Sequence, residues 1–281
     1  MSGFLAEMER SSRERVAQAM RQESAEEIER RARSAPPAPP LRCSPEGFDV
    51  IAELKLTSPA AGVLQRPDHD WLGRVTGYAR AGAAAVSVLT EPSRFDGSLE
   101  HLRRAASALA PLGVPAMRKD FIIDRYQLFE ARAAGAGGVL LIVRMLRGER
   151  IVELLKLALD LGLFVLLEAF DEADLLRTRE LLEHRARGGP SPSREPAVLV
   201  GINCRDLDTL EVLPARFAQL APLLPESSIA VAESGVATAA DARNVRKLGY
   251  RMALIGTALM RGDDPGRLLS EIFASTCTKS T

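Results

Sequence analysis

A carboxylate and an ammonium interrupt an apolar run near residue 50. In VIAELKLTSPAAG (50–62), Glu53 and Lys55 follow three apolar residues, and Ser58 precedes a proline that ends the run. Side chains two residues apart in a strand project to the same side, so Glu53 and Lys55 share one face. A lysine and a glutamate that face each other in a partly dry pocket can shift their pKa values toward acid–base catalysis.

Polar groups also stand at the ends of other apolar runs. They are Lys119, Glu168, Asn203 and Glu233, the last followed by Ser234. A single Lys or Glu at a strand end is more often solvated or salt-bridged. Six groups, counting Glu53 and Lys55, at the ends of five runs favour a shared acid–base site instead.

Two later segments carry a different signal, a glycine beside a hydroxyl residue. AESGVA places Ser234 before Gly235, and LIGTALM places Gly256 before Thr257. Glycine at such turns is common, so each segment alone is weak evidence. Together, in the seventh and eighth units of a repeating pattern, they indicate a phosphate site with backbone N–H donors.

The elements that must position these residues alternate regularly. Apolar, β-branched runs occupy 48–54, 84–90, 114–119, 138–143, 163–169, 197–203, 228–234 and 251–257, and helix-length amphipathic segments separate them. This alternation predicts an α/β protein, a (β/α)8 TIM barrel with its chemistry at the carboxyl ends of the strands. A doubly wound open sheet is the alternative, but no G-x-G-x-x-G motif follows the first run.

The chain divides near residue 48. Residues 1–47 comprise helical segments with an apolar face (Phe4, Leu5, Met8, Val16, Met20), a segment with Ser24 as its N-cap, and a proline-rich connector; residues 48–281 form the catalytic barrel. We expect both helical segments to cap the barrel mouth beside the loop after Lys55, although a plug at the opposite end or a dimer contact would also bury the apolar face. The Gly/Pro/Ser-rich stretch 185–197 is expected to be a surface insertion at the amino-terminal face.

Composition excludes several classes of protein. The 281 residues carry a formal net charge of zero, which gives no field for nucleic acid or a membrane surface. Three widely spaced cysteines predict neither a disulfide framework nor a metal site, and no apolar run reaches the ~18 residues of a membrane span. With no signal-peptide pattern, we expect a cytoplasmic protein.

The remaining reactive side chains are assigned to structure or solvent. Cys204 has no histidine nearby in sequence, and Arg118 should point away from the barrel interior because it alternates with Lys119. The others are expected to be structural or solvent-facing: His69, His101, His184, Arg144, Arg147 and Arg150.

Taken together, the motifs resemble those of indole-3-glycerol phosphate synthases. The resemblance is carried by IAELKLTSPAAG, RKDFIID, LLEAFDEADL, VGINCRDLDTLEV, VAESGV and LIGTALMR, between residues 50 and 261. It implies a carbon–carbon lyase of tryptophan biosynthesis, acting without cofactor on 1-(2-carboxyphenylamino)-1-deoxyribulose 5-phosphate. Ring closure with loss of carbon dioxide and water would yield indole-3-glycerol phosphate. No nucleic acid or membrane partner is implied, and a monomer or weak homodimer is expected.

The resemblance also implies roles for individual residues. Lys119 would be the general acid on the substrate carbonyl, a task that favours a pKa depressed beside another cation. Lys55 would contact the substrate carboxylate and act in dehydration, Glu168 would be a base or electrostatic group, and Glu53 its partner on the first strand. The remaining residues would be supporting, anthranilate-side or phosphate contacts: Asn203, Glu233, Ser234, Arg205, Ser58, Gly235, Gly256 and Thr257.

Departures from the family pattern fall mainly in loops. Leu56 and Ala60 replace an arginine and a serine of the first loop, Ala169-Phe170 replaces valine-histidine, and Cys204 replaces asparagine or serine. None removes a proposed catalytic group. The alternatives are phosphoribosylanthranilate isomerase, which would need a Cys and an Asp as its acid–base pair, and a non-catalytic binding or regulatory barrel.

Overall fold

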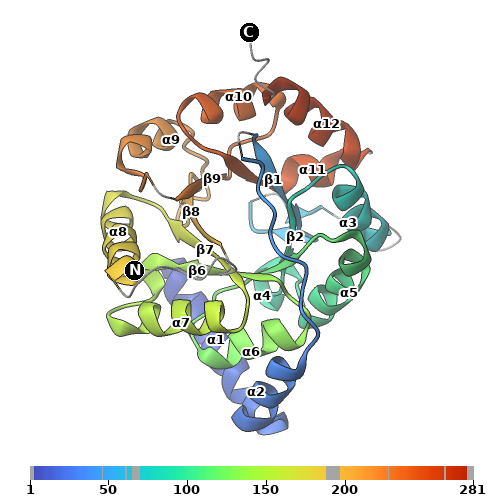
Figure 1. Cartoon of the computed structure of the whole chain (residues 1–281), viewed down its shortest axis with the longest axis vertical. Helices are drawn as coiled ribbons and strands as arrows, with labels where there is room; N and C mark the ends of the chain where they lie inside the picture. The colour runs from blue at the N-terminus through green and yellow to red at the C-terminus, as the bar shows by residue number, and fades with distance from the viewer. Residues whose placement is uncertain are drawn as a thin grey trace.

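A closed barrel of eight parallel strands forms the centre of the molecule (Figure 1). The computed structural model describes all residues except 1–2, 46, 61, 65–69, 188–196, 227, 263 and 277–281. The barrel strands are β1 (Asp49–Leu54), β4 (Ala85–Leu89), β5 (Ala116–Lys119), β6 (Gly138–Ile142), β7 (Phe164–Ala169), β8 (Val198–Asn203), β9 (Ile229–Glu233) and β10 (Met252–Ile255). Pairing of β10 with β1 closes the barrel, which confirms the predicted TIM fold and excludes the open sheet.

Helices cover the outside of the barrel because the strands are apolar on both faces. Every residue of β4, β6 and β7 is buried, as expected for a parallel sheet under a helical layer. The main helices are α3 (Trp71–Arg80), α5 (Leu99–Leu109), α6 (Arg125–Ala133), α7 (Glu149–Asp160), α8 (Glu172–Arg187), α9 (Ala215–Leu220), α10 (Ala239–Lys247) and α12 (Pro265–Thr276).

Small elements at the strand ends were not anticipated. The hairpin of β2 (Thr57–Ser58) and β3 (Gly62–Val63) follows β1, and α4 (Pro92–Phe95) follows β4. After β10 the chain forms α11 (Thr257–Arg261). Three 3₁₀ turns (110–112, 143–145 and 221–223) complete the described elements. The hairpin, α4 and α11 directly follow barrel strands, so they rim the carboxyl end of the barrel and shape the site there, whereas the turns at 110–112 and 221–223 precede strands at the other end.

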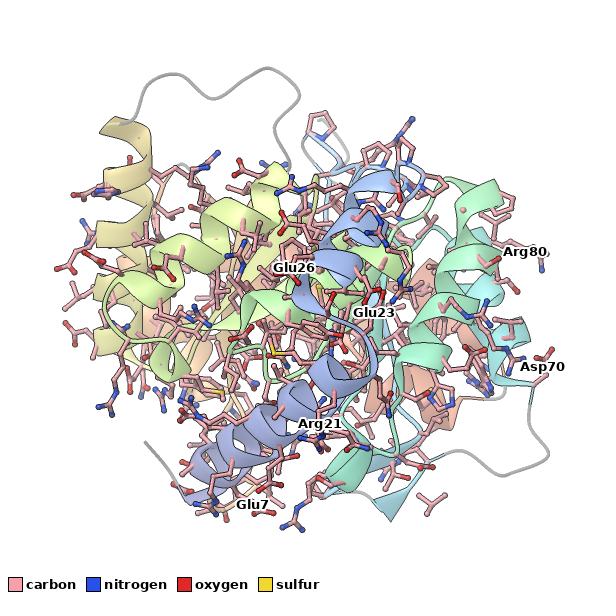
Figure 2. All side chains as sticks on the ribbon, turned by 90° about the horizontal axis from the view of Figure 1, so that it is seen from below. Glu7, Arg21, Glu23, Glu26, Asp70 and Arg80 are labelled. Carbon is pink, nitrogen blue, oxygen red and sulfur yellow. The ribbon has the colours of Figure 1, made fainter. Side chains whose placement is uncertain are left out.

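The N-terminal helices lie at different levels of the barrel. In Figure 2, Glu7 of α1 (Gly3–Gln22) lies at the same end of the molecule as Asp70, which begins α3, whereas α2 (Ala25–Ser34) runs toward the other end. Ser24 caps α2 through a capping box with Glu27, as predicted.

Only α1 lies where both helical segments were expected. The expectation that α2 also caps the mouth is wrong, because α2 packs on α6 outside the barrel. A connector then leads to β1, held by Arg132 at the carbonyls of Ala35 and Pro36. The predicted insertion 185–197 lies largely outside the described residues.

Candidate active site

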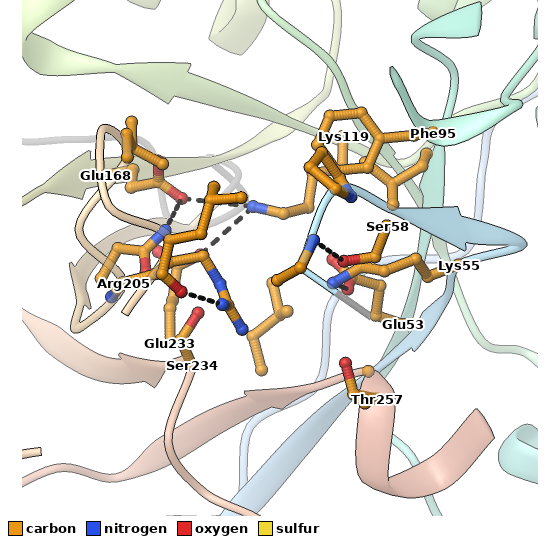
Figure 3. A pocket seen from close by; sticks show the side chains of 18 of the residues that line it. Glu53, Lys55, Ser58, Phe95, Lys119, Glu168, Arg205, Glu233, Ser234 and Thr257 are labelled. Atoms are coloured by element: carbon orange, nitrogen blue, oxygen red, sulfur yellow. Dashed lines mark hydrogen bonds and ion pairs between the residues drawn. The ribbon is translucent and has the colours of Figure 1, made fainter. Parts of the chain in front are cut away.

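A cavity of about 250 Å³ lies at the carboxyl ends of the barrel strands (Figure 3). Its polar groups come from strands β1, β5, β7, β8 and β9, from the loops after them, and from α11 after β10. The cavity brings together all twelve predicted site residues: Glu53, Lys55, Ser58, Lys119, Glu168, Asn203, Arg205, Glu233, Ser234, Gly235, Gly256 and Thr257.

Lys119, the last residue of β5, points into the cavity between two glutamates. Its Nζ lies 3.2 Å from Glu168 Oε2 and 3.4 Å from Glu233 Oε2. Burial acts to lower the pKa of Lys119, but the attraction of Glu168, Glu233 and Glu53 outweighs it, so that the pKa is raised. The expected depression is therefore wrong, since carboxylates and not a second cation dominate around this ammonium.

Glu168, Asn203 and Glu233 form a connected group on adjacent strands. Asn203 Nδ2 donates to Glu168 Oε2 at 3.3 Å, while Asn203 Oδ1 accepts from the backbone N–H of Arg205 at 2.9 Å. The amide of Asn203 is thereby oriented. Burial, together with the charge of Glu168, raises the pKa of Glu233 well above its usual value, while the Lys119 ammonium opposes this shift.

A glycine in β8 makes room for this group. A Cβ at Gly201 would lie 2.0 Å from Glu233 Oε1 and 3.0 Å from Leu166 Cδ1. Gly201 pairs in register with Glu168, so it occupies the level of the barrel at which the carboxylates meet. Gly201 was not among the predicted site residues. A glycine within an otherwise apolar strand could have indicated it, because such a glycine often marks a position where another group approaches the strand backbone closely.

The pair first noted in the sequence forms an ion pair on the other side of the cavity. Lys55 Nζ lies 2.7 Å from Glu53 Oε1, and the Glu53 side chain is almost fully buried (Figure 3). A Cβ at Gly256 would lie 2.3 Å from this same oxygen. Gly256 therefore has a packing role that was not predicted: it leaves space for the Glu53 carboxylate.

The turn after β9 has a backbone suited to a close approach by a ligand. Ser234 has φ of 61° and Gly235 has φ of 83°, so two consecutive residues are in the left-handed region. For a serine this conformation costs roughly 1–2 kcal/mol, a strain that is found most often at functional sites. Thr257 and Ser58 complete the hydroxyl groups along this part of the cavity.

An apolar wall faces the charged groups. Phe95 from α4 and Phe121 from the loop after β5 have ring centroids 6.3 Å apart, and Phe4 of α1 meets Phe121 edge to face at 5.8 Å. All three line the cavity together with Leu140 and Ile142. Such a wall suits a flat aromatic ring. These aromatic residues were not predicted as site residues, although Phe121 lies within the RKDFIID motif that contains Lys119.

Most of the residues assigned to structure behave as expected. Arg118 points away from the barrel interior and pairs with Asp120 and Glu130. Cys204 is buried, which raises the pKa of its thiol to about 12 and makes it a poor nucleophile. His101 packs edge to face on Trp71, whereas His69 lies outside the described residues.

Two of the arginines predicted to be mostly solvated are instead bound within the structure. Arg150 donates to Asp124 Oδ2 at 2.7 Å and to the carbonyl oxygen of Ile123 at 3.1 Å. Arg144 pairs with Asp171 and Asp174, both at 2.6 Å, and lies over the ring of Phe170. Phe170 is one of the departures noted in the sequence, and its ring gives Arg144 a cation–π contact.

Neither a metal-binding cluster nor a membrane-spanning helix occurs among the described residues. No group of three His, Cys, Asp or Glu side chains in the described part of the chain is arranged to hold a metal ion. Within the same residues, no helix has the length and apolar character needed to cross a bilayer.

Comparison with known proteins agrees with the geometry. A sequence model of the family described as indole-3-glycerol phosphate synthase matches residues 5–272. Proteins of that name from Kineococcus radiotolerans and Leifsonia xyli are 41% and 42% identical over 84% and 85% of this chain, and 80% and 86% of their own lengths.

Solved structures with low sequence identity share the fold alone. One is 3-hexulose-6-phosphate synthase from Salmonella typhimurium, with a TM-score of 0.60, 14% identity, and coverage of 82% of this chain and 98% of that one. The family match spans nearly the whole chain and includes every polar group of the cavity. The chain therefore belongs to the indole-3-glycerol phosphate synthase family.

Proposed function

We propose that the cavity converts 1-(2-carboxyphenylamino)-1-deoxyribulose 5-phosphate to indole-3-glycerol phosphate, carbon dioxide and water. The observation that carries this proposal is a buried ammonium, Lys119, held by Glu168 and Glu233 beside an aromatic wall. A carboxyphenyl ring fits against Phe95 and Phe121. The ribulose carbonyl then faces Lys119, and the phosphate lies toward Ser234, Gly235, Gly256, Thr257 and Ser58.

Ring closure requires a proton at the carbonyl oxygen. The aromatic carbon that bears the carboxylate bonds to the carbonyl carbon, and Lys119 donates its proton to the oxygen, which becomes a hydroxyl. The ring gains positive character at this step, and Glu168 and Glu233 stabilise it. As these glutamates turn toward the new charge, their hold on the ammonium weakens, so the raised pKa of Lys119 falls when the proton is needed.

The later steps use the opposite side of the cavity. Lys55 holds the substrate carboxylate until carbon dioxide leaves, and its ion pair with Glu53 orients the Lys55 side chain. Lys55 gives a proton to the new hydroxyl, which leaves as water, and removal of a proton from the CH2 carbon next to the ring nitrogen completes the indole. Glu168 accepts that proton, while Asn203 orients Glu168 and Arg205 supports the loop after β8 by donating to the carbonyl of Leu210 at 2.7 Å.

The experiment is Lys119→Met assayed by indole-3-glycerol phosphate fluorescence. Loss of one positioned acid costs ~10²–10⁴ in rate, and the fold should persist because the methionine keeps the length of the stem. A folded variant with near wild-type kcat would remove Lys119 from the mechanism. Absence of product from the unmodified protein would favour a non-catalytic barrel.

The isomerase alternative lacks its acid–base pair in this cavity. Among the described lining residues no cysteine occurs, and the one aspartate, Asp120, is held by Arg118 and Arg15. A test with phosphoribosylanthranilate should therefore show no turnover.

We also propose a cytoplasmic monomer or weak homodimer. The exposed large apolar side chains are spread over different elements, with Val63, Leu176 and Leu213 the most exposed, and they form no dimer-sized patch among the described residues. Cys43 and Cys204 are unpaired, which suits a reducing compartment. Sedimentation tests the oligomeric state, and cell fractionation tests the cytoplasmic location.

A further inference from the structure

A buried aspartate directly follows the proposed catalytic lysine. The Asp120 side chain has no solvent exposure and accepts hydrogen bonds from Arg118 Nη2 at 2.9 Å, Thr90 Oγ1 at 2.7 Å and its neighbour's N–H, that of Phe121, at 2.8 Å. A further cation reaches it from outside the barrel. Arg15 of α1 donates to both carboxylate oxygens of Asp120, at 2.8 and 3.0 Å.

Helix α1 also binds Phe121, the residue after Asp120. Ser12 is fully buried, and its hydroxyl donates to the carbonyl oxygen of Phe121 at 2.7 Å while accepting from Arg15 Nη2 at 2.8 Å. Arg15 and Ser12 are therefore linked to each other, and together they hydrogen-bond to residues 120 and 121. Their partners lie more than a hundred residues along the chain, so nothing local in the sequence accounts for the contact.

The carboxyl end of β5 needs this additional support because its pairing with the neighbouring barrel strands is incomplete. Lys119 pairs in register with Leu89 of β4 on one side. On the other side, the register between β5 and β6 stops one residue earlier, at Arg118 and Val139. Lys119 thus has a strand neighbour in register on one side only, and α1 adds side-chain contacts to the next two residues, Asp120 and Phe121.

Other contacts along α1 place its N-terminal half over the loops at the mouth. Phe4 lines the cavity and packs on Phe121, and Glu7 forms an ion pair with Arg94 of α4, next to Phe95. The helix is therefore fixed to both loops that build the aromatic wall. Of the two ion pairs described between α1 and these loops, Arg15–Asp120 is the one whose carboxylate is fully buried.

We propose that Arg15, together with Ser12, is a positioning residue that fixes the backbone of residues 119–121 and so places the Lys119 ammonium between Glu168 and Glu233. The inference rests on the proposed function, since it assumes that Lys119 carries the chemistry. Arg15 itself does not touch the cavity; it acts through Asp120.

The test compares Arg15→Met with Arg13→Met. Arg13 lies on the same helix and pairs with Glu9, but its side chain is 68% exposed and does not contact the barrel in that pair. A shift of about 1 Å in a catalytic group can cost on the order of 10²-fold in rate. We expect Arg15→Met to lower kcat by roughly 10- to 100-fold with a smaller change in KM, because the proposed phosphate contacts lie on other strands. Arg13→Met should match the unmodified protein.

A pH profile separates positioning from loss of stability. Lys119 is faced by Glu53, Glu168 and Glu233. The other charged residues that line the cavity are Lys55, Asp120, Arg205 and Arg261. Moving the ammonium away from the glutamates lowers its pKa, so the alkaline limb of the kcat profile should shift to lower pH in Arg15→Met. Arg15→Lys, which keeps one charge-assisted hydrogen bond to Asp120, should recover part of both effects.

All assays are run at a temperature where circular dichroism shows the variants fully folded. If Arg15→Met does not fold, Ser12→Ala removes only the grip on Phe121, and we expect it to lower kcat about threefold with the same direction of pH shift. A folded Arg15→Met, or failing that Ser12→Ala, whose kcat and alkaline limb match those of Arg13→Met overturns the inference. Full activity in Lys119→Met would instead overturn the proposed function.

Discussion

Replacing Gly201 by alanine should damage the site more than the barrel. The new Cβ would lie 2.0 Å from Glu233 Oε1, whereas ordinary contacts begin at 3.4 Å, so the carboxylate must move by 3.4 − 2.0 = 1.4 Å. Overpacking of this kind costs about 1–3 kcal/mol in the free energy of unfolding. Displacing a group that touches Lys119 should cost on the order of 10²-fold in kcat.

Gly138→Ala is the matched control for this prediction. Its Cβ would lie 2.3 Å from the Phe164 ring, a similar overlap, but Gly138 begins β6 at the end of the barrel away from the cavity. Both variants should lower Tm by several degrees, and only Gly201→Ala should lose kcat in the fluorescence assay. Equal kcat values for the two variants would refute the argument that Gly201 exists to seat Glu233.

Three further predictions follow from named contacts. Gly256→Ala should push Glu53 off Lys55 and lower kcat, because its Cβ would lie 2.3 Å from Glu53 Oε1; steady-state kinetics that match the unmodified protein would contradict this. Burial opposes ionisation of Asp120, but Arg118 and Arg15 outweigh it and lower the pKa of Asp120, so its stabilisation is present above about pH 4 and is lost as pH falls toward the folded value. The Tm advantage over Asp120→Asn should therefore shrink below pH 4, and a constant difference would argue against the charge network. Deleting residues 1–34 should remove activity even at temperatures where the barrel, proposed to begin at residue 48, remains folded by circular dichroism; a stable, fully active truncation would show that α1 is dispensable.

The strand ends could be predicted because two simple regularities determine them. Apolar runs alternate with amphipathic segments, and in a parallel barrel the residues that end those runs share one rim. Glu53, Lys119 and Glu233 could thus be assigned to one cavity from their positions in the chain. No knowledge of contacts was required for that step.

Contacts between distant segments could not be predicted in the same way. The seating of Glu233 at Gly201 depends on the register between β8 and β9, which leaves no mark in the sequence beyond an isolated glycine. The direction of the Lys119 pKa shift depends on which charges come nearest, and the sequence offered both Lys55 and several glutamates. The apolar face of an N-terminal helix shows that it is covered, but the surface that covers it is a tertiary property, which is why the placement of α2 was wrong.

The contacts of α1 with residues 120 and 121 join segments that are synthesised at different times. Arg15 leaves the ribosome first, and Asp120 follows 105 residues later. At 5–20 residues per second the helix waits roughly 5 to 20 s for its partner. During that interval Leu5, Met8 and Val16 have no barrel to bury them, so the nascent chain exposes an amphipathic helix that chaperones can hold. The anchor of Lys119 is therefore made from the earliest part of the chain but closes only when nearly half of the protein has emerged.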